Sequence, residues 1–171
     1  MKILAALCLA LAALKASAQT PRPNDVDSVE HLMAAVYDVI SGPAGAPRDW
    51  DRFRSLFYPE TGRMISSGRN ADGTVYLRNL TPEDYVTRAG KTFETMAFFE
   101  TPVATRGEVW DHFAELWSTY ESRHAKDEKP FARGINNFQM IHDGKRWWIV
   151  SIYWKAEDAE HPIPEKYLKQ P

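Results

Sequence analysis

The 171-residue sequence predicts an α+β fold, with helices in the first half of the chain and long strands in the second. Helical patterns and a small hairpin occupy residues 27–93, and strand-type residues dominate from residue 94 onward. The strongest single signal is Asp143-Gly144, a turn dipeptide between two runs rich in aromatic and β-branched residues. Both faces of this predicted hairpin are mostly apolar, so we expect both to be covered.

Taking Asp143 and Gly144 as the two turn residues fixes the pairing of the hairpin strands, with Asn136 opposite Ser151. Because side chains alternate between the faces of a strand, this register assigns each residue to one face. One face then carries Asn136, Ser151 and Tyr153, and the other carries Trp148, Val150, Ile152 and Trp154.

The helices are predicted from capping residues and apolar spacing. The first begins at Asp27, where Glu30 completes a capping box, and ends at Gly42-Pro43. The same signals predict the other elements: a short helix from about Asp49 to Pro59, a hairpin of 63–69 and 74–79, a helix from Thr81-Pro82 to about Phe93, and strands over 95–110, 113–124 and the closing hairpin.

The first 18 residues have the pattern of a secretory signal peptide. Lys2 precedes an apolar stretch from Ile3 to Leu14, and Ala16-Ser17-Ala18 is a small-residue cleavage site. Cleavage leaves residues 19–24 as an extended lead-in and removes Cys8, the only cysteine. We expect an exported protein, periplasmic or secreted, with no membrane segment after cleavage.

The remaining composition excludes several classes of function. The formal net charge is −2 and no basic run occurs, which argues against a nucleic-acid partner. The five histidines are scattered without a metal-binding spacing, so no metal is expected. No glycine-rich phosphate loop or G-x-S-x-G motif is present, and we expect no cofactor.

Three segments carry a family resemblance: Phe113–Arg123 (FAELWSTYESR), Arg133-Gly134-Ile135-Asn136, and the hairpin Asp143-Gly144-Lys145-Arg146-Trp147-Trp148-Ile149. With the order of elements, they resemble the NTF2-like (SnoaL-like) superfamily, a cystatin-related cone. The likeness covers about residues 25–157 and leaves 158–171 as a C-terminal tail. It implies a strongly curved sheet wrapped round helices, with a conical pocket, usually as a dimer. The superfamily includes isomerases, dehydratases, epoxide hydrolases, cyclases and binding domains of unknown ligand.

Enzymes of this superfamily typically use an Asp or Glu base inside the cone, often with His, Tyr or Arg. The catalytic candidates here are His31 on the first helix and Glu94 after the third. Glu94 and Glu100 precede Pro102, which indicates an edge strand or a bulge, so the direction of their side chains stays open. On the 113–123 strand, small and apolar residues identify the parity of Ser118 and Tyr120 as helix-facing.

Three functions remain open. The first is a non-catalytic domain that binds a small hydrophobic or aromatic molecule in the cone. The second is an enzyme of the isomerase, dehydratase or hydrolase type. The third is a protein-interaction module, which would remain if side chains filled the cone. The predicted ligand-binding residues are Tyr85, Ser118, Tyr120, Asn136, Ser151 and Tyr153, although the tyrosines fit an ordinary core equally well.

A homodimer is predicted through the outer face of the sheet, because its apolar residues are too many for a monomer to expose. The competing explanation is that the C-terminal tail covers this face through Ile163, Tyr167 and Leu168. The predicted interface consists of Trp117, Trp148, Val150, Ile152 and Trp154.

Overall fold

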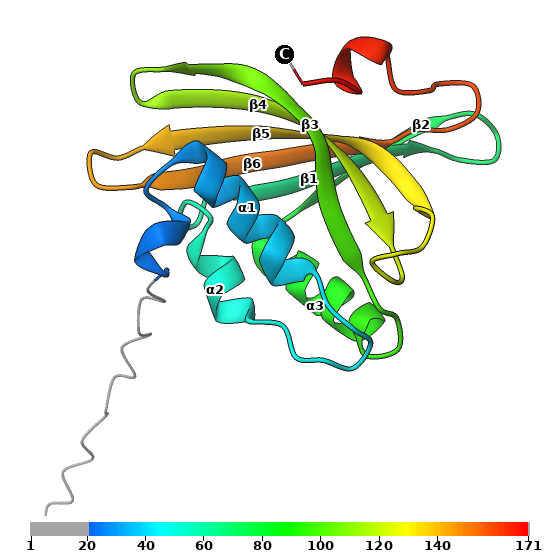
Figure 1. Ribbon diagram of the computed structural model, residues 1–171, viewed down its shortest axis with the longest axis horizontal. Coiled ribbons are helices and arrows are strands. Elements are labelled where there is room, and N and C mark those ends of the chain that lie inside the picture. Colours follow the sequence, from blue (N-terminus) through cyan, green and yellow to red (C-terminus); the bar gives the residue numbers. More distant parts are fainter. Residues whose placement is uncertain (1–20, 171) are drawn as a thin grey trace, which may run out of the picture.

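The computed structural model describes residues 21–170, so the predicted signal peptide at 1–18 and the start of the lead-in lie outside the described residues. Three α-helices pack on one face of a six-stranded sheet (Figure 1). The helices are α1 (Val29–Ile40), α2 (Trp50–Ser55) and α3 (Pro82–Phe93). The strands are β1 (Arg63–Arg69), β2 (Val75–Leu80), β3 (Phe99–Trp110), β4 (Phe113–Arg123), β5 (Ala132–His142) and β6 (Trp147–Ala156), with short 3-10 helices η1 (Pro23–Asp25) and η2 (Glu165–Tyr167).

The strand order of the sheet is β2-β1-β6-β5-β4-β3. All neighbouring strands are antiparallel except β1 and β6, which run parallel. Strands β2 and β3 are therefore the two edges. The predicted α+β class and the order of its elements are confirmed. The predicted end of α3 at Phe93 and the predicted bounds of β1 are confirmed, but β3 begins at Phe99 rather than at residue 95.

The caps of the helices explain where they begin. The side chain of Ser28, not of Asp27, caps α1 by accepting a hydrogen bond from the His31 backbone amide at 3.1 Å. The predicted capping box at Asp27 is therefore wrong by one residue. In α3 the predicted start is confirmed, because Thr81 and Asp84 form a reciprocal capping box around Pro82.

The core lies between the helices and the inner face of the sheet, which is the face that the helices cover. Leu32 of α1 and Phe53 of α2 are fully buried there, against Phe138 of β5 and Ile149 of β6. On β4 the side chains of Ala114, Leu116, Ser118, Tyr120 and Ser122 are all buried, which confirms the predicted parity of this strand.

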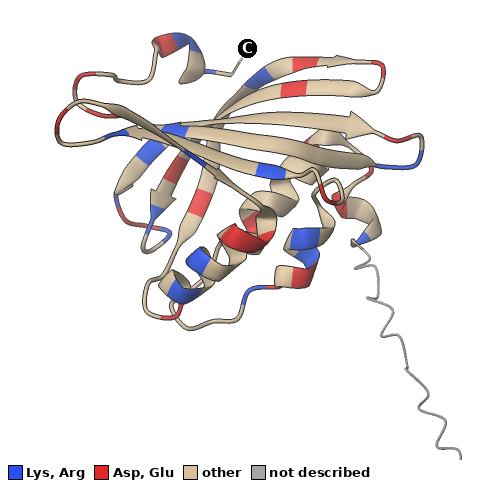
Figure 2. Cartoon of the chain, turned by 180° about the vertical axis from the view of Figure 1, so that it is seen from behind, with Lys and Arg blue, Asp and Glu red and all other residues tan. Residues whose placement is uncertain are grey.

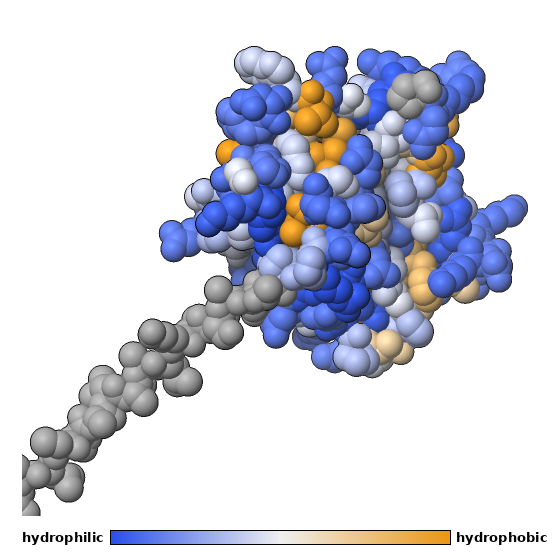
Figure 3. All heavy atoms as spheres, turned by 60° about the vertical axis from the view of Figure 1, so that its left-hand side comes forward, coloured by the Kyte–Doolittle hydropathy of each residue, from blue (hydrophilic) through white to orange (hydrophobic). Residues whose placement is uncertain are grey.

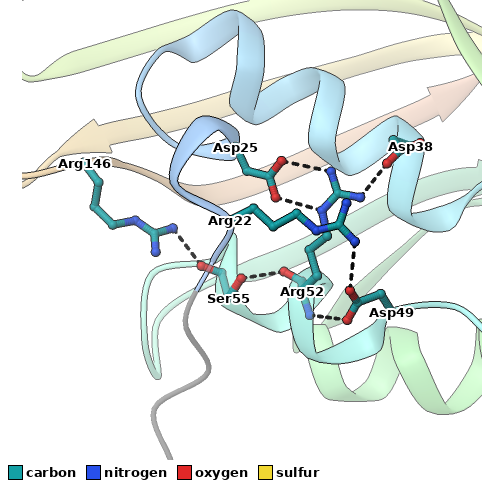
Figure 4. A network of polar contacts seen from close by, with 7 residues as sticks. All are labelled: Arg22, Asp25, Asp38, Asp49, Arg52, Ser55 and Arg146. Carbon is teal, nitrogen blue, oxygen red and sulfur yellow. Dashed lines mark hydrogen bonds and ion pairs between the residues drawn. The ribbon is translucent and has the colours of Figure 1, made fainter.

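A buried arginine holds η1, α1 and α2 together (Figure 4). Arg52 donates to both carboxylate oxygens of Asp25, at 2.7 and 2.9 Å, and to Asp38 at 2.5 Å. The pKa of Asp25 is lowered, first by its hydrogen bonds with Arg52. Nearby, Arg146 donates to the Ser55 carbonyl at 2.7 Å and so ties α2 to the start of β6.

The closing hairpin departs from the predicted register. Its turn has four residues, 143–146, because the Asp143 carboxylate accepts the backbone amides of Lys145 and Arg146. Further along, Gln139 pairs with Ser151 while Met140 pairs with Ile149, so Val150 forms a bulge.

The bulge reverses the direction of every later side chain on β6. Ile152 and Trp154 face inward, and Ser151 and Tyr153 face outward. The predicted facing of these four residues is wrong because of the bulge alone, since the four-residue turn shifts the register by two positions and leaves the faces unchanged.

The C-terminal tail crosses the outer face of the sheet, on the side opposite the helices (Figure 1). Tyr167 of η2 stacks on Trp117 of β4, with ring centroids 5.6 Å apart. Thr119 donates a hydrogen bond to the Tyr167 carbonyl at 2.5 Å, and Ile163 is buried. The tail therefore covers part of the outer face, as the competing explanation anticipated for Ile163 and Tyr167.

The rest of the surface is mixed in character. Acidic and basic residues are interspersed along the chain (Figure 2). The face that carries the ends of the long strands is largely hydrophilic, with separate small hydrophobic areas (Figure 3). No helix within residues 21–170 has the length and apolar character needed to cross a membrane.

Candidate functional site

A cavity of about 410 Å³ lies between the helices α1 and α3 and the inner face of the sheet. Its volume suits a small organic molecule of one or two rings. The side chains therefore do not fill the cone, which was the condition for the protein-interaction module. The walls are mostly apolar and include Val36, Ile40, Met64, Leu80, Phe93, Phe98, Phe138, Ile152 and Trp154.

One carboxyl group lies among these apolar walls. Glu100, near the start of β3, pairs with Ser122 of β4, so both side chains share the inner face. The Ser122 hydroxyl donates to Glu100 Oε2 at 2.8 Å, and the Asn136 amide donates to Glu100 Oε1 at 3.3 Å. Both oxygens of the carboxylate are therefore held in place.

The amide of Asn136 is itself fixed by a buried hydrogen-bond network. Its Nδ2 also donates to the hydroxyl of Tyr37 on α1, at 3.1 Å. Tyr37 shares a 2.7 Å hydrogen bond with Ser118, and Thr105 donates to Ser118 at 3.4 Å. Because both N–H groups of Asn136 are engaged, the amide has one orientation, and it positions Glu100.

The surroundings of Glu100 shift its protonation. Burial raises its pKa to about 7, and the hydrogen bonds from Ser122 and Asn136 oppose this by stabilising the ionised form. A carboxyl with a pKa near neutral pH exists in both forms there, so it can accept a proton and return it.

Two tyrosines line the cavity beside this carboxyl. The pKa of Tyr85 and the pKa of Tyr120 are both raised, by burial first and then by the charge of Glu100, so both phenols are neutral at neutral pH. Neither hydroxyl bonds to another residue within 21–170. Gly134 makes room for Tyr120, since a Cβ there would lie 2.4 Å from the Tyr120 hydroxyl. These hydroxyls are available as donors to a bound molecule.

Solved structures share this architecture at low sequence identity. A cystatin-like protein of unknown function from Nostoc punctiforme aligns with a TM-score of 0.58, over 77% of this chain and 90% of its own, at 10% identity. An NTF2-like protein of unknown function from Pseudomonas putida gives 0.57, over 77% and 87%, at 10% identity.

The fold is the NTF2-like cone. A Parabacteroides distasonis protein, provisionally named a ketosteroid isomerase, has the same fold, with a TM-score of 0.50 over 81% of this chain and 99% of its own, at 13% identity. No protein-family model matches the chain, and no curated protein matches its sequence significantly. At these identities the likeness shows the fold and not the function.

Three of the predicted ligand-binding residues come together in the NTF2-like cone: Tyr85, Tyr120 and Asn136 all line the cavity. Ser118 is fully buried behind them and bonds to Tyr37. Ser151 lies on the outer side of the bulge, where it donates to Gln139 at 2.8 Å.

Tyr153 is also on the outer face and shares a 2.8 Å hydrogen bond with Ser67. Its predicted place in the cavity, and that of Ser151, are wrong because the Val150 bulge turns both side chains outward.

The two predicted catalytic candidates lie outside the cavity. His31 is exposed on α1 and lies 2.6 Å from the carboxylate of Asp27. Glu94 is exposed at the C-terminal cap of α3, because the helix continues to Phe93 and no strand begins until Phe99. The expectation that one of them lies inside the cavity is therefore wrong.

The sequence pattern leaves the direction of Glu100 open, and it identifies neither Ser122, which donates to Glu100, nor Tyr37, which bonds to Asn136. Ser122 has the same strand parity as Ser118 and Tyr120, so the alternation of β4 is a signal that could have identified it. Glu100 could not be assigned in this way, because the register of β3 shifts between Pro102 and Ala104.

Within residues 21–170, no three His, Cys, Asp or Glu side chains gather in an arrangement that could hold a metal ion. Glu100 is the one carboxyl group among the cavity-lining residues. The described site can transfer a proton through this carboxyl group, and phenolic hydroxyls, an amide and the guanidinium groups of Arg78 and Arg88 line the same cavity.

Proposed function

We propose that this protein is an acid–base enzyme of the isomerase type, in which Glu100 moves a proton between two carbon atoms of a small, mostly apolar substrate. The observation that carries the proposal is the position of Glu100: inside an apolar cavity, held at both oxygens, with its pKa raised to about 7. This combination matches what a general base needs at neutral pH.

The tyrosine hydroxyls supply the second requirement of such a reaction. Removing a proton from the carbon next to a carbonyl group places negative charge on the carbonyl oxygen. The neutral hydroxyls of Tyr85 and Tyr120 line the same cavity and are available to donate hydrogen bonds to that oxygen. Donors aimed at developing charge in a mostly apolar site stabilise the transition state strongly.

A single carboxyl group favours isomerisation over hydrolysis. In an isomerisation the group that removes the proton holds it and returns it to another carbon, so one residue serves both steps. Hydrolysis also needs a group to activate water or to protonate a leaving group. Glu100 is the one carboxyl group lining the cavity, and no histidine or lysine lines it.

The second candidate is binding without turnover, which the apolar walls favour. A hydrophobic cavity with a few hydroxyls and an amide binds an aromatic molecule whether or not it reacts. In that case the Glu100–Ser122–Asn136 hydrogen bonds would serve to hold β3, β4 and β5 together.

The two candidates differ in one measurable property, hydrogen exchange at carbon. We suggest 2-tetralone in deuterated buffer as the probe, because it is an apolar bicyclic ketone with acidic hydrogens next to its carbonyl group. Proton NMR should show faster exchange with the protein, and a rate that rises with pH and levels off above about pH 7.

Glu100→Gln should lower the exchange rate at least about 100-fold. Glu115→Gln is the matched control, because Glu115 lies on the other face of β4, where it accepts a hydrogen bond from Asn137. If the ketone binds and the wild-type protein does not accelerate exchange, the enzymatic proposal fails and binding alone stands.

We also propose that the protein acts after export and as a homodimer. The signal-peptide pattern of residues 1–18 supports export. Large aromatic side chains that remain exposed on the outer face of the sheet support self-association.

A further inference from the structure

Two arginines line the same cavity as Glu100. Arg78 lies on β2 and Arg88 on α3, which packs against β1 and β2. Because β2 and β3 are the two edges of the sheet, Arg78 and Glu100 come from opposite edges. The sheet curves round the helices, so residues from both edges line one cavity of about 410 Å³, and a single small molecule can contact both.

Neither guanidinium group has a carboxylate partner within residues 21–170. Arg78 lies over the ring of Tyr76, 4.9 Å from its centroid. Arg88 lies one helical turn after Asp84 and helps to lower the pKa of that carboxyl, but Asp84 is bonded to Thr81 in the capping box.

Most other arginines of the described residues hold a hydrogen-bond acceptor, either a carboxylate or, as for Arg69 and Arg146, a backbone carbonyl. Arg52, Arg54 and Arg133 each bond a carboxylate. A guanidinium group that bonds no other residue keeps its N–H donors available for a carboxylate ligand.

A hydroxyl group lies beside this positive end of the cavity. Ser66 of β1 is directly opposite Arg78 in the β1–β2 hairpin, so both side chains share a face, and both line the cavity. The lining thus carries two cations and one carboxyl group, in a chain whose formal net charge is −2. This local excess of positive charge favours an anionic group near β2.

We propose that the substrate is a small organic acid whose carboxylate binds Arg78, Arg88 and the Ser66 hydroxyl. Its apolar body fills the middle of the cavity, and its reacting carbon lies at Glu100. Only the reacting end of this inference rests on the proposed function, and the carboxylate-binding end can be tested separately.

The experiment compares two probes of equal shape, 2-naphthylacetate and the neutral 2-naphthylacetamide. Binding is measured by isothermal titration calorimetry and by the fluorescence of the chain, which includes Trp154 in the cavity wall. The wild-type protein should bind the acid at least about tenfold more tightly than the amide at pH 8. The preference should shrink at high salt, since Arg78 and Arg88 are exposed.

Arg78→Gln and Arg88→Gln should each weaken binding of the acid about tenfold and leave binding of the amide unchanged. Arg69→Gln is the matched control, because Arg69 is on the same hairpin but bonds the Gly73 carbonyl and does not line the cavity. Equal affinity for the two probes, or no binding of the acid, would overturn the inference.

Glu100→Gln separates this inference from the proposed function. It should lower the hydrogen-exchange rate of 2-tetralone at least about 100-fold and keep the preference for the acid, because the preference depends on the arginines. A wild-type protein that prefers the acid but does not catalyse exchange would refute the proposed function and support the carboxylate-binding site. A wild-type protein that catalyses exchange without preferring the acid would support the proposed function and refute the carboxylate-binding site.

Discussion

Glu100 differs from the other carboxyl groups of this protein in what surrounds it. Asp25, Glu83 and Glu157 each accept hydrogen bonds from an arginine, and the pKa of each is lowered. Glu100 accepts hydrogen bonds from Ser122 and Asn136, which are neutral, and burial raises its pKa instead. A group that is costly to ionise in the folded state is a common feature of an acid–base site.

This raised pKa predicts a pH dependence of stability. The folded protein holds a proton on Glu100 up to about pH 7, whereas the unfolded chain loses it near the model-peptide value of 4.5. The contribution of Glu100 to the free energy of unfolding is therefore fully present below pH 4.5, and it is lost as the pH rises through 7. The total loss in unfolding free energy is at most about 3 kcal/mol.

Chemical denaturation of the wild-type protein and of Glu100→Gln at pH 5 and pH 8 tests this. The variant should gain stability relative to the wild type between the two pH values, because it has no carboxyl group to ionise. A difference between the two proteins that stays constant with pH would show that Glu100 is not buried as described.

Tyr120 allows a second prediction about a single residue. Tyr120→Phe removes one hydroxyl from the cavity, and it should lower the hydrogen-exchange rate of 2-tetralone by about 10- to 100-fold. Binding of the ketone should change much less, because the ring remains. The control is Tyr153→Phe, since Tyr153 is on the outer face. Equal effects of the two substitutions would argue against a role for the Tyr120 hydroxyl.

Among the elements, the strands show which features a sequence can specify. The alternation of β4 predicted the inward direction of Tyr120 correctly, because this strand has no bulge. On β6, one extra residue, Val150, exchanged the faces of all residues after it. A bulge depends on strand pairing and twist, which involve residues distant in sequence, so local alternation does not reveal it.

The candidate site could be predicted only in part for the same reason. Asn136 and Tyr120 lie on strands without a shift in this region, and their place in the cavity followed from parity. Glu100 is separated from the regular part of β3 by the shift near Pro102, so its direction could be established only by its pairing with Ser122. The raised pKa of Glu100 depends on burial by several elements, which no local pattern contains.

The contact between Arg52 and Asp25 supports a prediction about how the helices are held. Arg52→Ala leaves Asp25 nearly buried without its partner, and it should lower the unfolding free energy by about 3 kcal/mol. Arg54→Ala is the control, because Arg54 pairs with the exposed Glu83, and it should cost about 0.5 kcal/mol. Urea denaturation of both variants measures the difference. Similar losses would show that the buried pair has no special role.

At the scale of the whole molecule, export is tested by the N-terminus of the protein recovered outside the cytoplasm. Cleavage after Ala18 should give a first residue Gln19, which N-terminal sequencing or mass spectrometry identifies. The mature chain should then contain no cysteine, so its stability should not change on addition of a reducing agent. Recovery of a chain that begins at Met1, or that is acylated at Cys8, would reject export by this signal.

The outer face of the sheet determines the prediction on assembly. Ile152 and Trp154, two residues of the predicted interface, face inward, and Tyr167 of the tail stacks on Trp117. The tail nevertheless leaves large aromatic side chains in solvent on this face: Trp110 is 80% exposed, Phe113 45% and Trp117 38%. We therefore predict that a homodimer uses the β3–β4 end of the face.

Light scattering on residues 19–171 should give the mass of a dimer, because these aromatic side chains form an apolar surface that a partner copy can cover. Phe113→Arg should shift the protein to a monomer, since it places a charge in the apolar contact. Glu30→Arg is the control, because it introduces an arginine at an exposed position of α1, on the opposite side of the sheet. A second chain that lacks residues 158–171 distinguishes the tail from a partner as the cover. If the full mature chain is a monomer and only the shortened chain associates, the tail is the natural cover of this face and the homodimer does not exist.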